Sequence, residues 1–135
     1  MARTVLCEIV TPERIVYHNE AQMVVAPAID GEVGILPLHA PLVTTLKPGE
    51  IRVRIDDNEV DWIATSGGYL QVHEDKVIIL ADRAELASKI DVERARAEKS
   101  AIEERIASLP EKDEAALDEL KWYEAQIAVG SHRQK

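Results

Sequence analysis

The sequence predicts a mainly β protein with a helical addition: an antiparallel sandwich or barrel of short strands, followed by an antiparallel hairpin of two helices. Two observations support this fold class. Up to about residue 87, short runs rich in Val and Ile alternate with turn-forming residues. Beyond that point Ala, Glu, Lys and Arg dominate, and apolar residues recur at helical spacing. We therefore expect a β domain at residues 1–87 and a helical domain at residues 88–135.

Nine short runs in the first domain are predicted as strands. Polar segments at residues 18–20, 56–59 and 74–76 are expected to be turns between them. Apolar and cationic side chains alternate along residues 51–55, so one face of that strand is expected in the core. The predicted strands are 4–10, 15–17, 22–26, 31–35, 42–45, 50–55, 60–65, 69–73 and 77–80.

The second domain carries the signals of two helices. Asp91 is expected to cap the first helix and Pro110 to end it, while Asp113 caps the second and Gly130 terminates it. Each helix shows one narrow apolar stripe, and at about 25 cal/mol per Å² such a stripe contributes little. We therefore expect the hairpin either to dock on another surface or to move. The stripes are Ala95, Ile102, Ile106 and Leu109 in the first helix, and Ala116, Leu120, Tyr123 and Ile127 in the second.

Charge and composition exclude several classes of protein. A formal net charge of −9 opposes binding to nucleic acid or to anionic lipid. Cys7 is the only cysteine, which excludes a disulfide within the chain, and we interpret it as a small apolar strand residue. No signal peptide is recognised, and no apolar run approaches the roughly 20 residues that cross a bilayer. We expect a soluble, cytoplasmic protein without direct bilayer insertion.

The sequence offers no set of residues suited to catalysis. Its four histidines lie far apart, without the spacing of a zinc site, and the usual phosphate-binding loops are missing. Ser66, Gly67 and Gly68 lack the context of a nucleophile turn and are better explained as a turn between strands. We therefore expect a protein that is not an enzyme, with no metal and no cofactor.

One segment, residues 31–42, is unusual. It contains two glycines and two prolines among several apolar side chains, and proline cannot donate a hydrogen bond to a sheet. Two interpretations remain open from composition alone. The segment is either a rigid connection between two sheets or an ordered apolar surface that binds a partner at low entropic cost.

Four patterns, in order, resemble a known family. Residues 31–35 are Gly-Glu-Val-Gly-Ile, and residues 39–42 are His-Ala-Pro-Leu. Lys-Pro-Gly at 47–49 precedes a strand, and Ser-Gly-Gly-Tyr at 66–69 precedes Val-Ile-Ile-Leu-Ala-Asp at 77–82. Ile-Asp-Val-Glu-Arg-Ala follows at 90–95. The chain thereby resembles the epsilon subunit of bacterial and chloroplast F-type ATP synthases.

This resemblance implies a ten-stranded antiparallel β-sandwich followed by the helical hairpin. It also implies a rotor role: the sandwich binds the gamma subunit and rests on the ring of c subunits, so that proton-driven rotation turns the central stalk. The chain would be a non-catalytic, peripheral part of the complex at the cytoplasmic face of the bacterial inner membrane. Glu32, His39, Pro41 and Leu42 match docking positions. Glu32 is expected near the polar loops of the c ring; the alternative is a solvated loop carboxylate.

In this family the hairpin is a regulatory element, either folded against the sandwich or extended toward the catalytic head, where it blocks ATP hydrolysis. Some members bind ATP in the folded form. Ala101, Trp122 and Gln126 stand at or near positions where those members place arginines, so ATP is not expected as a cofactor. Asp91 is then better explained as a helix cap. The residues that match or fit the ATP motif are Glu85, Ile90, Asp91, Arg94 and Ala95.

The resemblance also implies contacts between an extended hairpin and an acidic loop of the beta subunit. Within residues 113–132 the second helix has only Lys121 as a base, among several carboxylates that would oppose such docking. The first helix is the better source of cations. Its candidate inhibitory residues are Arg94, Arg96, Lys99 and Arg105.

Overall fold

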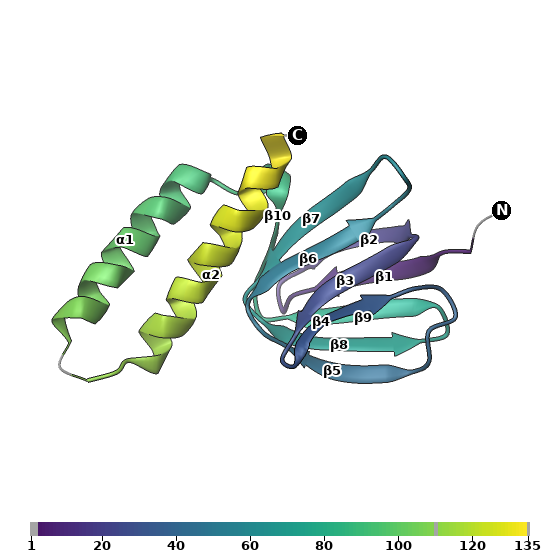
Figure 1. Ribbon diagram of the computed structural model, residues 1–135, viewed down its shortest axis with the longest axis horizontal. Coiled ribbons are helices and arrows are strands. Elements are labelled where there is room, and N and C mark those ends of the chain that lie inside the picture. The colour runs from purple at the N-terminus through teal and green to yellow at the C-terminus, as the bar shows by residue number, and fades with distance from the viewer. Residues whose placement is uncertain (1–2, 110, 135) are drawn as a thin grey trace.

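Ten strands and two α-helices form the protein in the computed structural model, which describes residues 3–109 and 111–134 (Figure 1). The strands are β1 (Val5–Val10), β2 (Ile15–Ala21), β3 (Met23–Ala28), β4 (Gly31–Ile35), β5 (Leu42–Leu46), β6 (Gly49–Arg54), β7 (Val60–Thr65), β8 (Gly68–His73), β9 (Lys76–Ala81) and β10 (Ala84–Leu86). The helical elements are the 3₁₀ turn η1 (Ala87–Lys89), α1 (Val92–Ser108), α2 (Glu114–Gly130) and the 3₁₀ turn η2 (Ser131–Gln134).

The hydrogen-bonded strands follow one path, β10-β7-β6-β3-β5-β8-β9-β1-β2, with β4 attached to β3. β3 is the crossing point, because it pairs with β6 near its start and with β5 only at Ala28 and Leu46. The path folds into two layers around a common core (Figure 1). We call β10, β7, β6, β3 and β4 the first layer, and β5, β8, β9, β1 and β2 the second. This confirms the sandwich, although β1 and β9 run parallel.

Two predictions for the strands need correction. The expected turn at residues 18–20 is wrong: these polar residues continue β2, where they pair with Glu8, Cys7 and Leu6 of β1, and the chain breaks at Gln22 instead. An edge strand exposes one side to water, so polar residues are compatible with it. The strand pattern also missed β10, whose three residues pair with β7; so short a strand has no alternation to detect.

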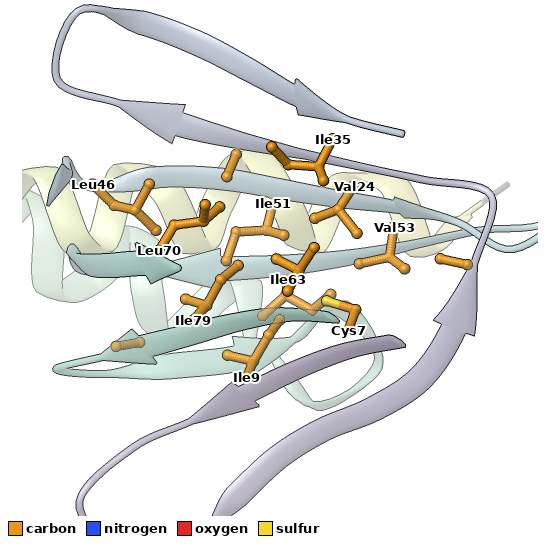
Figure 2. Packing of buried hydrophobic residues seen from close by; sticks show 14 of the residues in the cluster. Cys7, Ile9, Val24, Ile35, Leu46, Ile51, Val53, Ile63, Leu70 and Ile79 are labelled. Carbon is orange, nitrogen blue, oxygen red and sulfur yellow. The ribbon is translucent and has the colours of Figure 1, made fainter. Parts of the chain in front are cut away.

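The core between the layers is aliphatic, as expected for a chain without Phe. Its branched side chains interdigitate from both layers (Figure 2). Cys7 lies among them with no exposed surface, and burial raises the pKa of its thiol to about 12. This confirms its interpretation as a small apolar residue. The residues labelled in Figure 2 are Cys7, Ile9, Val24, Ile35, Leu46, Ile51, Val53, Ile63, Leu70 and Ile79.

The ends of the helices follow the predicted caps. The side chain of Asp91 accepts a hydrogen bond from the Arg94 amide at 3.0 Å, and Asp113 accepts one from the Ala116 amide at 3.2 Å. Helix α1 ends at Ser108. Pro110, which was expected to end it, lies outside the described residues.

Helix α2 has a second apolar face, so the prediction of a single narrow stripe is wrong for this helix. Trp122, Ala125 and Val129 are buried against Ala64 of β7 and against Ile90. α2 therefore lies between α1 and the first layer, and the hairpin is folded against the sandwich (Figure 1). The predicted stripe lies partly between the helices, where Ile102 and Ala116 are buried, whereas Leu109 follows α1 and is 39% exposed. Neither helix, within the described chain, is long and apolar enough to span a membrane.

Candidate docking surface and regulatory hairpin

The loop after β4 is pinned to the turn between β8 and β9. The Leu38 amide donates a hydrogen bond to Oδ1 of Asp75 at 2.6 Å, and Leu38 adopts a φ of 68°. Arg3 donates to Oδ2 of the same carboxylate at 2.7 Å. These contacts, the Leu38 amide first and Arg3 second, lower the pKa of Asp75. An ordered loop, and not a flexible one, therefore carries the unusual segment of the sequence.

The pinned loop presents apolar side chains to solvent. Leu36 is 55% exposed and Leu38 is 71% exposed, although both are large and apolar. Positive φ at Leu38 is uncommon for a residue with a branched side chain, and the Asp75 contact holds it there. A loop ordered with its apolar groups outward supports the docking interpretation more than the simple connection.

The second layer continues this apolar surface. Val43 on β5, Tyr69 on β8 and Leu80 on β9 point away from the core and are strongly exposed. Tyr69 and Leu80 are directly paired across neighbouring strands. We call Val43, Tyr69 and Leu80 the outer apolar face. Sequence reasoning missed it, and the available signal was the apolar residue at solvent-side positions of β5, β8 and β9.

The predicted docking residues fall into two groups. Glu32 is exposed on β4, with Arg52 of β6 at 3.3 Å, on the outward side of the first layer. His39 lies in the pinned loop, where its Nδ1 is 2.7 Å from the carbonyl oxygen of Ala40. Pro41 is exposed beside it, whereas Leu42 begins β5 and packs partly against the core. Glu32 thus belongs to one outward surface of the sandwich, and His39 and Pro41 to the end near the β8–β9 turn.

The structure brings the residues of the predicted ATP motif together. Glu85, Asp91, Arg94 and Ala95 line one pocket of about 260 Å³. Lys89, Trp122, Tyr123 and Gln126 complete its wall, and Ile90 is buried in the adjoining apolar cluster.

Charges in this pocket are balanced and partly engaged. Asp91 already caps α1, and Glu85 lies 3.7 Å from Arg14. Lys89 and Arg94 are the cations among the lining residues.

Arg83, which sequence reasoning missed, lies 5.1 Å from the centre of the Trp122 ring and forms an ion pair with Glu119 at 2.8 Å. Arg83 therefore secures α2 to the sandwich.

The candidate inhibitory cations lie on α1. Arg96 pairs with Glu93 on the same helix at 2.9 Å, and Lys99 lies 3.7 Å from Glu124 of α2. Within the described residues, Arg94 and Arg105 have no carboxylate within ion-pair distance. The described part of the chain also holds no cluster of three or more His, Cys, Asp or Glu residues suited to a metal ion.

Comparison with known proteins covers most of the chain. Residues 4–87 match the family described as "ATP synthase, Delta/Epsilon chain, beta-sandwich domain". The ATP synthase epsilon chain of Desulforamulus reducens is 50% identical over 108 residues, which are 80% of this chain and 81% of that relative. The ATP synthase epsilon chain of Acidithiobacillus ferridurans is 44% identical over 128 residues, 95% of this chain and 89% of that one.

Two solved structures share the fold. A chain of the Euglena gracilis mitochondrial ATP synthase, in a structure of OSCP, F1 and the c-ring in rotational state 1, matches with a TM-score of 0.75 at 24% identity. The match covers 93% of this chain and 80% of that chain. A chain from the central stalk and c-ring of the Tetrahymena thermophila mitochondrial ATP synthase matches with a TM-score of 0.62 at 12% identity, covering 98% of each.

Proposed function

The chain belongs to the ATP synthase epsilon family, and on this premise we propose that its sandwich couples the rotating membrane ring to the central stalk while its hairpin restrains ATP hydrolysis. As an epsilon chain it is a non-catalytic subunit and a peripheral part of the membrane-bound ATP synthase. The specific partners we propose are the gamma subunit, the c ring and, for an extended hairpin, the beta subunit. We place this complex, driven by protons, at the cytoplasmic face of a bacterial inner membrane.

The observation that carries the rotor role is the outer apolar face. Val43, Tyr69 and Leu80 are 70%, 58% and 51% exposed, and they lie on three neighbouring strands. Exposed apolar side chains that adjoin one another mark a binding surface, whereas isolated ones are ordinary. The rigid loop with Leu36 and Leu38 adjoins the same layer through Asp75. We assign this surface, with His39 and Pro41 at its end, to the gamma subunit.

Glu32 supports a separate contact with the c ring. Its side chain is 62% exposed, and Arg52 of β6, on the other side of β3, lies 3.3 Å from it. A carboxylate fixed at the surface offers a hydrogen-bond acceptor to polar loops without first losing much side-chain freedom. Because Glu32 and the outer apolar face point from different layers, the sandwich can contact two partners at once.

The docking proposal is tested by charge substitution on the outer apolar face. Leu80→Glu should weaken binding to the gamma subunit at least about tenfold, since burying one Leu side chain is worth about 1.5–3 kcal/mol. Co-purification with gamma and titration of the two subunits measure this effect. Val60→Glu, an equally polar change at an exposed site of the first layer, is the control. Binding that survives Leu80→Glu unchanged contradicts the assignment.

The hairpin is proposed to be a separable unit, with the boundary between residues 87 and 88. The residues of the sandwich core all come from strands, while the apolar cluster under α2 lies outside that core. The family match over residues 4–87 supports the same boundary. A unit with its own small interface can open without unfolding the sandwich.

Restraint of hydrolysis is tested by removing the hairpin from the complex. Deleting residues 88–135 should raise the ATPase activity of the assembled enzyme. Because the deletion also uncovers Ala64 and Trp62, a second variant keeps the hairpin and replaces Arg96 and Arg105 by Gln. It should raise activity as well if α1 supplies the contact with beta. Unchanged hydrolysis in both variants contradicts the restraint and leaves the docking proposal standing.

ATP is not proposed as a ligand of the hairpin. Among the lining residues of the pocket, Lys89 and Arg94 are balanced by Glu85 and Asp91. A triphosphate needs several charge-assisted donors, and Gln126 supplies none. The Asp91 carboxylate serves the N-terminus of α1.

A further inference from the structure

The turn that follows α2 grips the sandwich, and we infer that His132, Trp62 and Glu50 form a clasp that holds the hairpin in its docked position. The regulatory meaning of this clasp rests on the proposed restraint of hydrolysis. Its existence as a contact that controls opening of α2 does not depend on that proposal.

The clasp consists of a ring stack and a hydrogen bond. The His132 and Trp62 rings have centroids 3.6 Å apart and an angle of 10° between their planes. Nε2 of His132 is 2.8 Å from Oε1 of Glu50. Glu50 and Trp62 lie on the paired strands β6 and β7, on the outward face of the first layer. One side chain from η2 therefore contacts two strands at once.

The turn that presents His132 is tightly built. The Ser131 hydroxyl donates to the carbonyl of Ala128 at 2.7 Å, and the Ser131 amide donates to the carbonyls of Ile127 and Val129. Gly130 lets the chain pass close to the start of α1, because a Cβ at that position would lie 2.5 Å from Cγ2 of Val92. The close approach fixes where η2 begins. His132 is thereby aimed at β6 and β7.

The position of the clasp gives it control over release. His132 lies at the end of α2 farthest from the link to α1, so this end of α2 stays on the sandwich while the contact persists. The side chains of His132 and Glu50 are 23% and 37% exposed, and Trp62 and His132 line a cavity of about 370 Å³ together with Tyr17 and Asp61. Water therefore reaches the contact. By contrast, Trp122, Ala125 and Val129 are buried, so water reaches them only after α2 has separated from the sandwich.

Amide hydrogen exchange on the full-length chain tests the clasp. His132→Ala removes both the stack and the hydrogen bond and should accelerate exchange at residues 122–129 by about tenfold, since contacts of these two kinds each change an equilibrium several-fold. Glu50→Ala removes the hydrogen bond alone and should accelerate the same exchange by a smaller, several-fold factor. The strands of the second layer should keep their exchange rates. His73→Ala, at an exposed position on β8, is the matched control and should change neither.

A double-mutant cycle separates the pairing from general damage. Both substitutions remove the same hydrogen bond. The His132→Ala, Glu50→Ala double variant should therefore exchange about as fast as His132→Ala alone, well short of the product of the two single effects. Unchanged exchange in His132→Ala overturns the clasp, and so do fully multiplicative effects of the two substitutions. In the assembled enzyme, His132→Ala should lower the rate of ATP hydrolysis, because a released hairpin is free to extend toward the catalytic head. Faster exchange with unaltered hydrolysis supports the clasp and contradicts the proposed restraint.

Discussion

Asp75 shows how one residue can order a distant loop. It sits in the two-residue turn between β8 and β9 with a φ of 60°, next to Glu74 with a φ of 50°. Both lie in the left-handed region that Asp tolerates better than most residues. From there its carboxylate receives the Leu38 amide and the Arg3 guanidinium. The exposed conformation of Leu38 thus depends on a residue 37 positions away.

Replacing Asp75 by Asn should loosen the loop while keeping the turn, because Asn also accepts a positive φ. The folded carboxyl has a lowered pKa, so its contribution is full above its unfolded value of about 3.8 and is lost as the pH falls through the lower folded value. The protection factor of the Leu38 amide is the exchange rate of an unstructured amide divided by the observed rate at the same pH. Followed by NMR from neutral to strongly acidic pH, this factor should fall in acid for the natural chain.

In Asp75→Asn the protection factor of the same amide should be low at every pH, with no such fall in acid. Glu74→Gln is the control, since Glu74 shares the turn conformation while the Leu38 and Arg3 contacts go to Asp75. An acid transition that persists in Asp75→Asn contradicts the role given to this carboxylate.

At this scale, local chemistry was predictable and contacts distant in sequence were not. The caps at Asp91 and Asp113 follow from a residue type placed just before a helical pattern, and both were predicted correctly. The Asp75 contact with Leu38 and the Arg83 contact with Trp122 join segments whose relative positions depend on the whole fold. No spacing rule relates such residues.

Among the elements, α2 shows most clearly where pattern reasoning fails. Its apolar residues form two sets at helical spacing, one at 116, 120, 123 and 127 and another at 122, 125 and 129. Only the position of α2 between α1 and β7 shows that both sets are used. The hairpin is therefore more firmly docked than one stripe suggests.

Gly130→Ala should weaken the docking of α2. Alanine favours a helix over glycine by about 1 kcal/mol, but its Cβ would lie 2.5 Å from Cγ2 of Val92, a stiff β-branched side chain. Overpacking of this kind costs about 1–3 kcal/mol, so the steric effect should win. Thermal unfolding and exchange of the α2 amides measure the outcome.

Gly34→Ala serves as the comparison, because a Cβ at Gly34 on β4 meets no atom within 4 Å. It should leave α2 unaffected. Stabilisation of α2 by Gly130→Ala would show that the start of α1 yields more readily than the close approach indicates.

At the scale of the whole molecule, two apolar clusters stabilise the described part of the chain. The larger lies between the sandwich layers and the smaller lies between α2 and the first layer. Alternating apolar residues predicted most strands of the sandwich, and the family resemblance supplied the tenth. The docking site of α2 on the sandwich could not be predicted from the sequence. It includes Ala64 and Ile90, which form one surface only after the strands have assembled.

The candidate sites divide in the same way. The sequence placed Glu32, His39 and Pro41 in one docking segment, and the structure distributes them over two outward surfaces. The outer apolar face went unnoticed because Val43, Tyr69 and Leu80 come from three separate strands. A short segment can be recognised in a sequence, whereas a surface assembled from pairing register requires the fold.

The aliphatic sandwich core has an optical consequence. The chain has two tryptophans, and both lie where the hairpin meets the sandwich: Trp62 under His132, and Trp122 under Arg83. The labelled core contains no indole ring (Figure 2). Intrinsic tryptophan emission therefore reports on the hairpin alone and is silent about the interior of the sandwich. The molecule carries its own probe of the docked state, and no label has to be attached to follow it.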